Sequence, residues 1–306
     1  MFGSHLSIAG GLENALLKAR ELDMDCVQIF TKNQRQWRVP PFADEQVDRW
    51  FEHQQSTGIT RAVSHDSYLI NLASPEPATR DKSINLFREE LTRCQRLGIT
   101  ELVMHPGAHM KAGEQAGLKR VVAAFDQLHD ELPALDVITC VEVTAGQGTA
   151  LGYHLDHLAW IIEHVAQPAR MGVCLDTAHL LAAGYDLTTA AGAKKVIKGV
   201  DAGVGLARVR VLHVNDSKTA RGSRVDRHAH IGHGHVALDA FAVFVNEPAF
   251  ADVPKILETP KEQTDDGREW DEINLERLRG LIRPGRRGRK KTKTSKAKKT
   301  SRATRR

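Results

Sequence analysis

The sequence has few cysteines, and no two of them form a Cys-x-x-Cys pair. Cys26, Cys94, Cys140 and Cys174 are the only four in 306 residues. Three of them lie in short apolar runs that are typical of strands. The pattern therefore favours buried free thiols in a reducing compartment over disulfide bonds or a thiolate zinc site.

Long apolar runs are also lacking. Residues 1–11 have neither the basic start nor the apolar stretch of a secretory signal, and no run approaches the length that spans a bilayer. We therefore expect a cytoplasmic protein that makes no contact with membranes.

Acidic residues are missing from the C-terminal end of the chain. Residues 283–306 contain 13 of the 43 Lys and Arg and no acid, which leaves 30 basic against 38 acidic residues in 1–282, a net charge of −8. This tail has almost no large apolar residue, so the sequence predicts that it is disordered. A solubilising tail is the simple interpretation. Our hypothesis is that the tail contacts duplex DNA non-specifically through its phosphates.

Residues 1–282 alternate between short apolar runs and amphipathic stretches. The runs that predict strands are residues 3–8, 26–31, 61–65, 101–105, 137–144, 172–176, 209–214 and 255–258. The stretches that predict helices are residues 12–22, 45–55, 78–97, 114–132, 155–165, 187–200, 238–245 and 270–282. Eight strand-then-helix units favour one α/β domain, a (β/α)8 TIM barrel, over an open doubly wound sheet.

Polar side chains end six consecutive predicted strands. They are His65, His105, Glu142, Asp176 with His179 three residues later, His213 and Glu258. Barrel enzymes place their active sites at the C-terminal ends of the strands, so we expect these side chains to converge. Carboxylates that converge need a compensating positive charge, and His with Asp or Glu is a ligand set for Zn²⁺ or Mn²⁺.

The loop after the seventh strand adds a further pair of candidate ligands. Asp226 and His228 stand two residues apart, a spacing that points both side chains to one side of an extended backbone. Nine candidate ligands exceed what one ion with an open position uses, so the sequence predicts a cluster of ions. Such a cluster suits phosphoryl chemistry, because one ion activates water while others neutralise phosphate oxygens and the leaving group.

The chain resembles the endonuclease IV family, metal-dependent apurinic/apyrimidinic endonucleases of base excision DNA repair. The matching segments are GSHLSIAGG (3–11), FTKNQRQW (30–37), HDSYLINLA (65–73), HPG (105–107), EVTAGQG (142–148), CLDTAH (174–179), residues 213–234 and ETP (258–260). They occur in the family's order over nearly all of residues 1–260. The resemblance implies a monomeric TIM barrel that acts on double-stranded DNA containing abasic sites, in the cytoplasm and, in a bacterium, at the nucleoid.

The resemblance also implies three zinc ions, with Mn²⁺ as an alternative at some sites. Glu142, with His65 and His105, would hold the first ion and bridge it to the second. The second would be completed by Asp176, His213 and Glu258. The third would be bound by His179, Asp226 and His228.

The implied reaction is hydrolysis of the phosphodiester 5′ to an abasic site, which leaves a 3′-hydroxyl and a 5′-deoxyribose phosphate. Glu142 and Glu258 would be the catalytic carboxylates, because they are ligands of the first two ions, between which the attacking hydroxide would be held, while the third ion would stabilise the 3′-oxygen leaving group. Arg35, Tyr68 and Leu69 resemble the residues that enter the base stack at the lesion. Local loop packing is the alternative role for Tyr68 and Leu69.

Two positions depart from the family pattern. Val143 stands where the family usually has Asn, which predicts a missing hydrogen bond beside the bridging Glu142. His233 stands where the family usually has Glu, and with His235 it is either a weak extra metal site or, as we favour, an exposed loop histidine.

Two other functions remain open at the level of sequence. One is a metal-dependent sugar isomerase or epimerase of the same barrel superfamily, which would need neither the Asp226 and His228 pair nor the wedge of Tyr68 and Leu69. The other is a catalytically inactive protein that binds damaged DNA, for which Val143 is the motive and the basic tail is the anchor.

Overall fold

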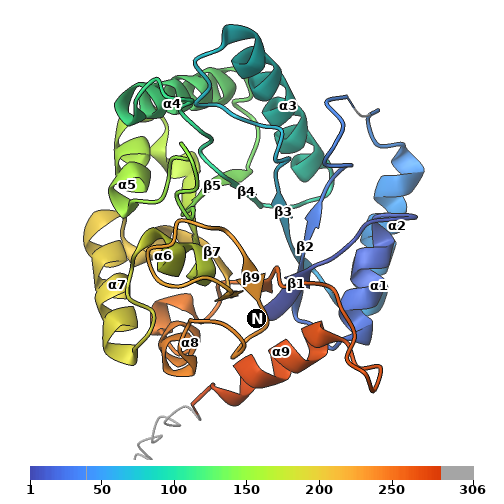
Figure 1. Ribbon diagram of the computed structural model, residues 1–306. Coiled ribbons are helices and arrows are strands. Elements are labelled where there is room, and N and C mark those ends of the chain that lie inside the picture. The colour runs from blue at the N-terminus through green and yellow to red at the C-terminus, as the bar shows by residue number, and fades with distance from the viewer. Residues whose placement is uncertain (39, 284–306) are drawn as a thin grey trace, which may run out of the picture.

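Eight parallel strands close into a barrel, and helices surround it (Figure 1). The computed structural model describes residues 1–38 and 40–283. The barrel strands are β1 (Phe2–His5), β2 (Cys26–Phe30), β3 (Arg61–His65), β4 (Glu101–Met104), β5 (Ile138–Glu142), β6 (Met171–Asp176), β7 (Val209–His213) and β10 (Lys255–Leu257). Each strand pairs with its neighbour in sequence, and β10 closes the ring against β1. The predicted TIM barrel is confirmed.

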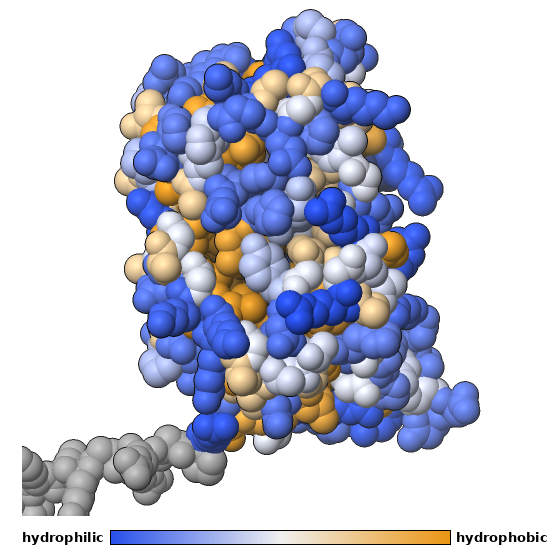
Figure 2. Space-filling view, turned by 60° about the vertical axis from the view of Figure 1, so that its left-hand side comes forward, coloured by the Kyte–Doolittle hydropathy of each residue, from blue (hydrophilic) through white to orange (hydrophobic). Residues whose placement is uncertain are grey.

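Helices follow the strands and cover the outside of the barrel (Figure 1). They are α1 (Glu13–Glu21), α2 (Asp44–Thr57), α3 (Pro77–Arg96), α4 (Glu114–Glu131), α5 (Leu155–His164), α6 (Thr177–Ala183), α7 (Ala190–Gly203), α8 (Leu238–Val245) and α9 (Trp270–Gly280). Hydrophilic residues dominate the side of the molecule shown in Figure 2, and the apolar residues visible there lie between them. The helices thus turn their apolar faces to the barrel.

The structure corrects several predicted boundaries. The first strand ends at His5, not at residue 8. The helix predicted from residue 187 begins at Ala190, because the Thr189 side chain caps it by accepting a hydrogen bond from the Gly192 backbone N–H. Helix α6 was not predicted, because it has seven residues and starts directly after β6. A two-stranded antiparallel ribbon, β8 (Asp216–Ser217) with β9 (His228–Ala229), was not predicted either.

Inward-facing side chains fill the barrel in layers. One layer is apolar and fully buried and consists of Cys26, Val63, Val103, Cys140, Cys174, Val211 and Ile256. The position two residues further along each strand points to the same side and lies nearer the C-terminal end. These seven positions form a polar layer of Gln28, His65, His105, Glu142, Asp176, His213 and Glu258. The apolar layer is therefore the floor of the site described next.

All four cysteines are buried and free, as the sequence predicted. Three of them belong to the apolar floor. The predicted disordered tail is residues 283–306, and all of it except Arg283 lies outside the described part of the chain. None of the described helices has both the length and the hydropathy that a bilayer crossing needs.

Candidate metal centre

Glu142 is the centre of the polar layer. Its carboxylate is fully buried at the end of β5, and four histidine rings surround it. The Nε2 atoms of His65 and His105 lie 3.2 and 3.1 Å from Oε2, and the Nδ1 atoms of His213 and His179 lie 2.9 and 3.2 Å from Oε1. A carboxylate with nitrogen ligands beside each oxygen is suited to bridge two metal ions.

A second group of ligand atoms gathers around His213, where β6, β7 and β10 end. Its Nδ1 lies 3.2 Å from Glu258 Oε2 and 3.9 Å from Asp176 Oδ2. Ligand atoms of Glu142, Asp176, His213 and Glu258 all lie within 4.8 Å of one another. Three carboxylates this close repel one another unless cations lie between them.

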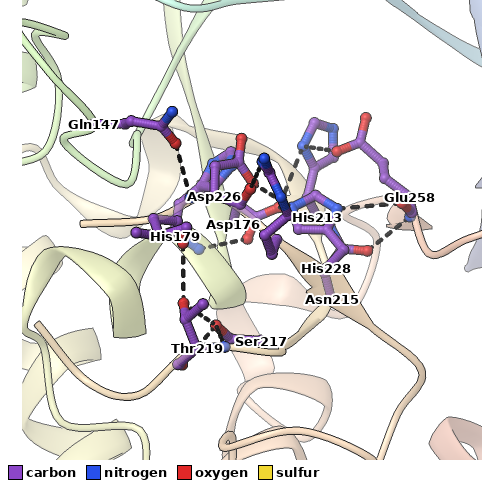
Figure 3. Close-up of polar contacts among 12 residues, drawn as sticks. Gln147, Asp176, His179, His213, Asn215, Ser217, Thr219, Asp226, His228 and Glu258 are labelled. Atoms are coloured by element: carbon purple, nitrogen blue, oxygen red, sulfur yellow. Dashed lines mark hydrogen bonds and ion pairs between the residues drawn. The ribbon is translucent and has the colours of Figure 1, made fainter. Parts of the chain in front are cut away.

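A third group combines α6 with the loop that leads into β9 (Figure 3). His179 Nε2 lies 3.1 Å from Asp226 Oδ2, and His228 Nε2 lies 3.4 Å from Asp226 Oδ1. His228 Nε2 also lies 3.6 Å from Asp176 Oδ2. Both Nε2 atoms are buried, and among the described residues neither has a partner in good hydrogen-bonding geometry. Two nitrogen atoms therefore point into this group with their bonding capacity unused.

The loop between β7 and α8 carries Asp226 and His228, and buried Asp216 holds it. The Asp216 carboxylate accepts hydrogen bonds from four backbone N–H groups, at Ser217, Gly232, Gly234 and Val236. Burial nonetheless raises the Asp216 pKa, and the four donors oppose that rise. A side chain at position 234 would place its Cβ 2.2 Å from the Ser217 carbonyl oxygen, so only glycine fits there.

Backbone carbonyl oxygens orient three of the histidine rings through their Nδ1 atoms. The distances from Nδ1 are 2.9 Å for His65 to the Asp66 oxygen, 3.0 Å for His179 to the Val143 oxygen and 3.2 Å for His228 to the Glu258 oxygen. Such contacts fix the tautomer that leaves Nε2 free for a metal. Because His179 uses the backbone of Val143, this contact needs no side-chain amide at that position.

Two polar residues that lie behind the ligands, Gln28 and Asn215, were not predicted from the sequence. Gln28 Oε1 lies 2.8 Å from His213 Nε2, and Gln28 Nε2 donates to Glu258 Oε1 at 2.7 Å and lies 2.9 Å from His5 Nδ1. Asn215 Nδ2 donates to Asp176 Oδ2 at 2.7 Å, and Asn215 Oδ1 accepts from the Glu258 backbone at 2.7 Å. A glutamine within the apolar run CVQIF was the available signal for Gln28.

The electrostatics of the centre favour charged groups in spite of burial. Burial disfavours the protonated form of His213, but Glu258 and Glu142 outweigh it and raise the His213 pKa to about 9. Burial likewise opposes ionisation of Asp226, and the neighbouring His179 outweighs it and lowers the Asp226 pKa to about 2. The carboxylates therefore hold positive charge at this site, which divalent cations supply in place of protons.

The donor set fits divalent metal ions. Nitrogen and oxygen ligands on rigid strand ends are the set for Zn²⁺ or Mn²⁺, and the Nε2 atoms of His179 and His228 are donors with unused capacity. Cys174 Sγ also lies within 4.8 Å of ligand atoms of Glu142 and His213. Burial raises the Cys174 pKa well above its ordinary value, so it lies beneath the centre as a neutral thiol.

Two cavities flank Tyr68 at the mouth of the barrel. One, of about 480 Å³, is lined by His105, His179 and Asp226, and the other, of about 790 Å³, by Arg35 and Glu258. Tyr68 lines both and is 66% exposed. Arg35 is exposed, whereas Leu69 is half-buried and packs against the core. The structure thus places Arg35 and Tyr68 at the mouth of the barrel. Part of the Leu69 side chain packs against the hydrophobic core, so only part of it is accessible there.

His233 and His235 are exposed and belong to none of the ligand groups found among the described residues. The His233 ring lies 5.0 Å from that of Trp270.

Fold and site together define a class, the TIM-barrel enzymes whose mouth is built to bind metal. A sequence model of the family described as xylose isomerase-like TIM barrel matches residues 16–281. The probable endonuclease 4 of Geotalea daltonii is 48% identical over 281 residues, which cover 92% of this chain and 98% of that protein. The chain belongs to the endonuclease IV family within this barrel superfamily.

Solved structures agree with this assignment. The crystal structure of endonuclease IV from Thermus thermophilus is similar with a TM-score of 0.79 and 34% identity, over 92% of this chain and 98% of that one. A D-psicose 3-epimerase from Clostridium cellulolyticum is similar with a TM-score of 0.66 and 16% identity, over 92% and 98%. At that identity the epimerase shares the fold alone.

Proposed function

We propose that this protein is an apurinic/apyrimidinic endonuclease of base excision repair, which hydrolyses the phosphodiester 5′ to an abasic site in double-stranded DNA. The observation that carries the proposal is the third ligand group. Asp226 reaches both His179 and His228 from a loop that Asp216 holds in place. A sugar isomerase or epimerase has no need of this addition to the strand-end ligands.

Nine side chains would hold three zinc ions, with Mn²⁺ as an alternative at some sites. Glu142 would bridge the first ion, on His65 and His105, to the second, on Asp176, His213 and Glu258. His179, Asp226 and His228 would hold the third. Bound ions of this kind activate water near neutral pH and neutralise the charge that develops on phosphate and leaving-group oxygens.

The chain's own residues supply position and exclusion of water. Gln28 orients His213 and Glu258 together, since it contacts both side chains. The apolar floor closes the barrel beneath Glu142, which strengthens every electrostatic interaction above it. Exposed Tyr68, which lines both cavities, would fill the gap that a missing base leaves in the stack, and Arg35, which lines the larger cavity, would assist it.

The proposal extends to the oligomeric state, the cellular location and the basic tail. The protein acts as a monomer on chromosomal DNA in the cytoplasm, and its basic tail adds non-specific contacts to phosphates. The tail carries the positive charge that the acidic body lacks.

The proposal is tested by incision of a duplex oligonucleotide that carries one tetrahydrofuran abasic analogue. Cleavage directly 5′ to the analogue, leaving a 3′-hydroxyl and abolished by removal of metal with a chelator, is the expected result. Tight binding without cleavage at saturating zinc would identify a binding protein instead. Absence of both, with turnover of a ketose in a sugar panel, would identify an epimerase.

A further inference from the structure

The connection between β2 and α2 carries Arg35 and is irregular throughout. Its described residues, 31–38 and 40–43, form turns and bends and otherwise have no regular secondary structure. Such a segment leaves backbone carbonyl groups without partners from secondary structure. Five of them accept hydrogen bonds from cationic side chains: those of Thr31, Asn33, Gln36, Pro40 and Phe42.

The cations come from two sources. Lys32 turns back into its own loop and donates to the Asn33 and Gln36 oxygens at 3.2 and 2.9 Å. Arg93 and Arg96 come from α3. Arg93 donates to the Thr31 oxygen at 2.6 Å and to the Pro40 oxygen at 3.1 Å, and Arg96 donates to the Phe42 oxygen at 2.7 Å.

A buried carboxylate holds this arrangement together. Glu90 Oε1 lies 3.7 Å from Lys32 Nζ, and Glu90 Oε2 accepts a hydrogen bond from the Thr31 hydroxyl at 2.6 Å. The side chains of Lys32 and Glu90 are both 0% exposed. Burial lowers the Lys32 pKa and raises the Glu90 pKa, and each group opposes the shift of the other. An isolated charge at either position would be strongly disfavoured.

The same loop is tied to the one that presents Tyr68. Ser67 donates from its hydroxyl to the Gln34 carbonyl oxygen at 3.0 Å, and the Tyr68 backbone N–H donates to Gln34 Oε1 at 3.3 Å. Arg35 follows Gln34 directly, and both Arg35 and Tyr68 line the larger cavity. The positions of the two exposed side chains are therefore coupled.

We propose that Lys32, Glu90, Arg93 and Arg96 form a charge clamp that positions Arg35 and Tyr68 for recognition of the lesion. These are positioning residues, since none of them is a candidate metal ligand. Glu90, Arg93 and Arg96 follow one another at intervals of three on one side of α3, so a single rigid helix fixes the whole loop. The clamp makes an irregular segment rigid before DNA binds, which lowers the entropy cost of binding. This inference rests on the proposed function for its DNA readout.

The first test uses no DNA. Trypsin cleaves after Arg35 and Arg38, and the rate at these two bonds in the native full-length protein is followed by mass spectrometry. Glu90→Gln should raise that rate by about tenfold or more, because local opening then needs less free energy. Arg88→Ala is the matched control: Arg88 lies on the same helix but pairs with Glu131 of α4. Trypsin should cleave this variant after Arg35 and Arg38 at the wild-type rate.

A double variant protects the test against simple misfolding. Lys32→Met with Glu90→Leu replaces the buried ion pair by apolar side chains, a change that is often neutral for stability. It removes the hydrogen bonds to the Asn33 and Gln36 oxygens. We expect a folded protein with unchanged metal content and faster cleavage after Arg35.

The second test measures recognition. Affinity for the tetrahydrofuran duplex relative to the undamaged duplex should fall by about tenfold to a hundredfold in Glu90→Gln and in the double variant, because misplacement of about 1 Å has effects of this size. KM should rise more than kcat falls. Faster tryptic cleavage with unchanged discrimination, or unchanged cleavage, would overturn the proposal. If the wild-type protein never incises the abasic duplex, the proposed function fails, while the tryptic rates still decide whether the clamp exists.

Discussion

The polar layer and the apolar floor of the barrel come from the same strands, two residues apart. Cys140 lies beneath Glu142, and Val63 lies beneath His65. The strand backbone is continuous across both layers, so the strands present a ligand and its support as one rigid unit. The two layers have different roles. The floor stabilises the fold and excludes water from the lower side of the polar layer, and the polar layer performs the chemistry.

The largest effect should follow a change in the centre of the polar layer. Glu142→Gln keeps the size of the side chain but removes the charge that four histidines surround. Incision of an abasic duplex should fall by about a thousandfold or more, since a glutamine amide has one neutral oxygen in place of two charged ones and could not bridge the two proposed ions. Single-turnover kinetics measure this, and bound zinc counted in the same sample should also fall. Activity within tenfold of wild type would remove Glu142 from the account.

A change in the floor should act on stability instead. Ile256 is fully buried, two residues before Glu258. Ile256→Ala should lower the free energy of unfolding by about 2–5 kcal/mol, because apolar burial is removed and a cavity is left behind. Urea unfolding gives this number. Zinc content and incision at 25 °C should stay within severalfold of wild type. If incision disappears while the protein remains folded, the two layers are not separable.

A buried histidine outside the barrel interior gives a pH test of the stability side. Burial and the nearby Arg170 lower the pKa of His129 to about 4. The unfolded chain therefore binds more protons between about pH 6.5 and 4, so the contribution of neutral His129 is complete above about pH 6.5 and declines as pH falls towards 4. The decline amounts to at most about 3 kcal/mol.

Urea unfolding of wild type and His129→Leu, both in chelator, isolates this contribution. The variant should lose less stability than wild type between pH 7 and 4.5. Parallel curves for the two proteins would show that His129 does not titrate as its burial requires.

The smallest effect concerns the basic tail. Deletion of residues 283–306 should weaken the dependence of DNA binding on salt, by about 0.9 in the log–log slope for each phosphate that the tail no longer neutralises. Single-turnover incision at saturating enzyme should not change, because the tail has no His, Cys, Asp or Glu in its sequence that could bind a metal ion. An unchanged salt slope would leave the tail without a role in DNA binding.

Most of this architecture was predictable from two sequence features: the alternation of apolar runs with amphipathic stretches, and the His, Asp and Glu residues at the ends of the apolar runs. All eight predicted strands form and pair in the order of a closed barrel, and the nine candidate ligands meet at one end of it. Asp226 and His228 face His179 together, as a two-residue spacing in extended chain requires. Such patterns can be recognised in the sequence alone, because the spacing of the apolar residues distinguishes a strand from a helix.

The features that sequence could not supply depend on contacts between distant segments. Gln28 contacts residues 185 and 230 positions away, and no local pattern marks such a contact. Helix α6 was missed because nearly all its residues are buried, which leaves no amphipathic period to detect. The expected consequence of Val143 could not be judged either, since His179 bonds to the backbone of that residue. The charge clamp on the β2–α2 connection is likewise visible only in three dimensions.

The central claim is that the nine candidate ligands, six of which belong to the polar layer, hold one cluster of three ions whose occupation creates the activity. The direct measurement is a titration of metal-free protein with zinc, in which bound zinc and the rate of abasic-site incision are determined on the same samples. The account predicts three zinc ions per chain at saturation and full incision only as the third is bound. A plateau at one ion per chain with full incision would contradict it.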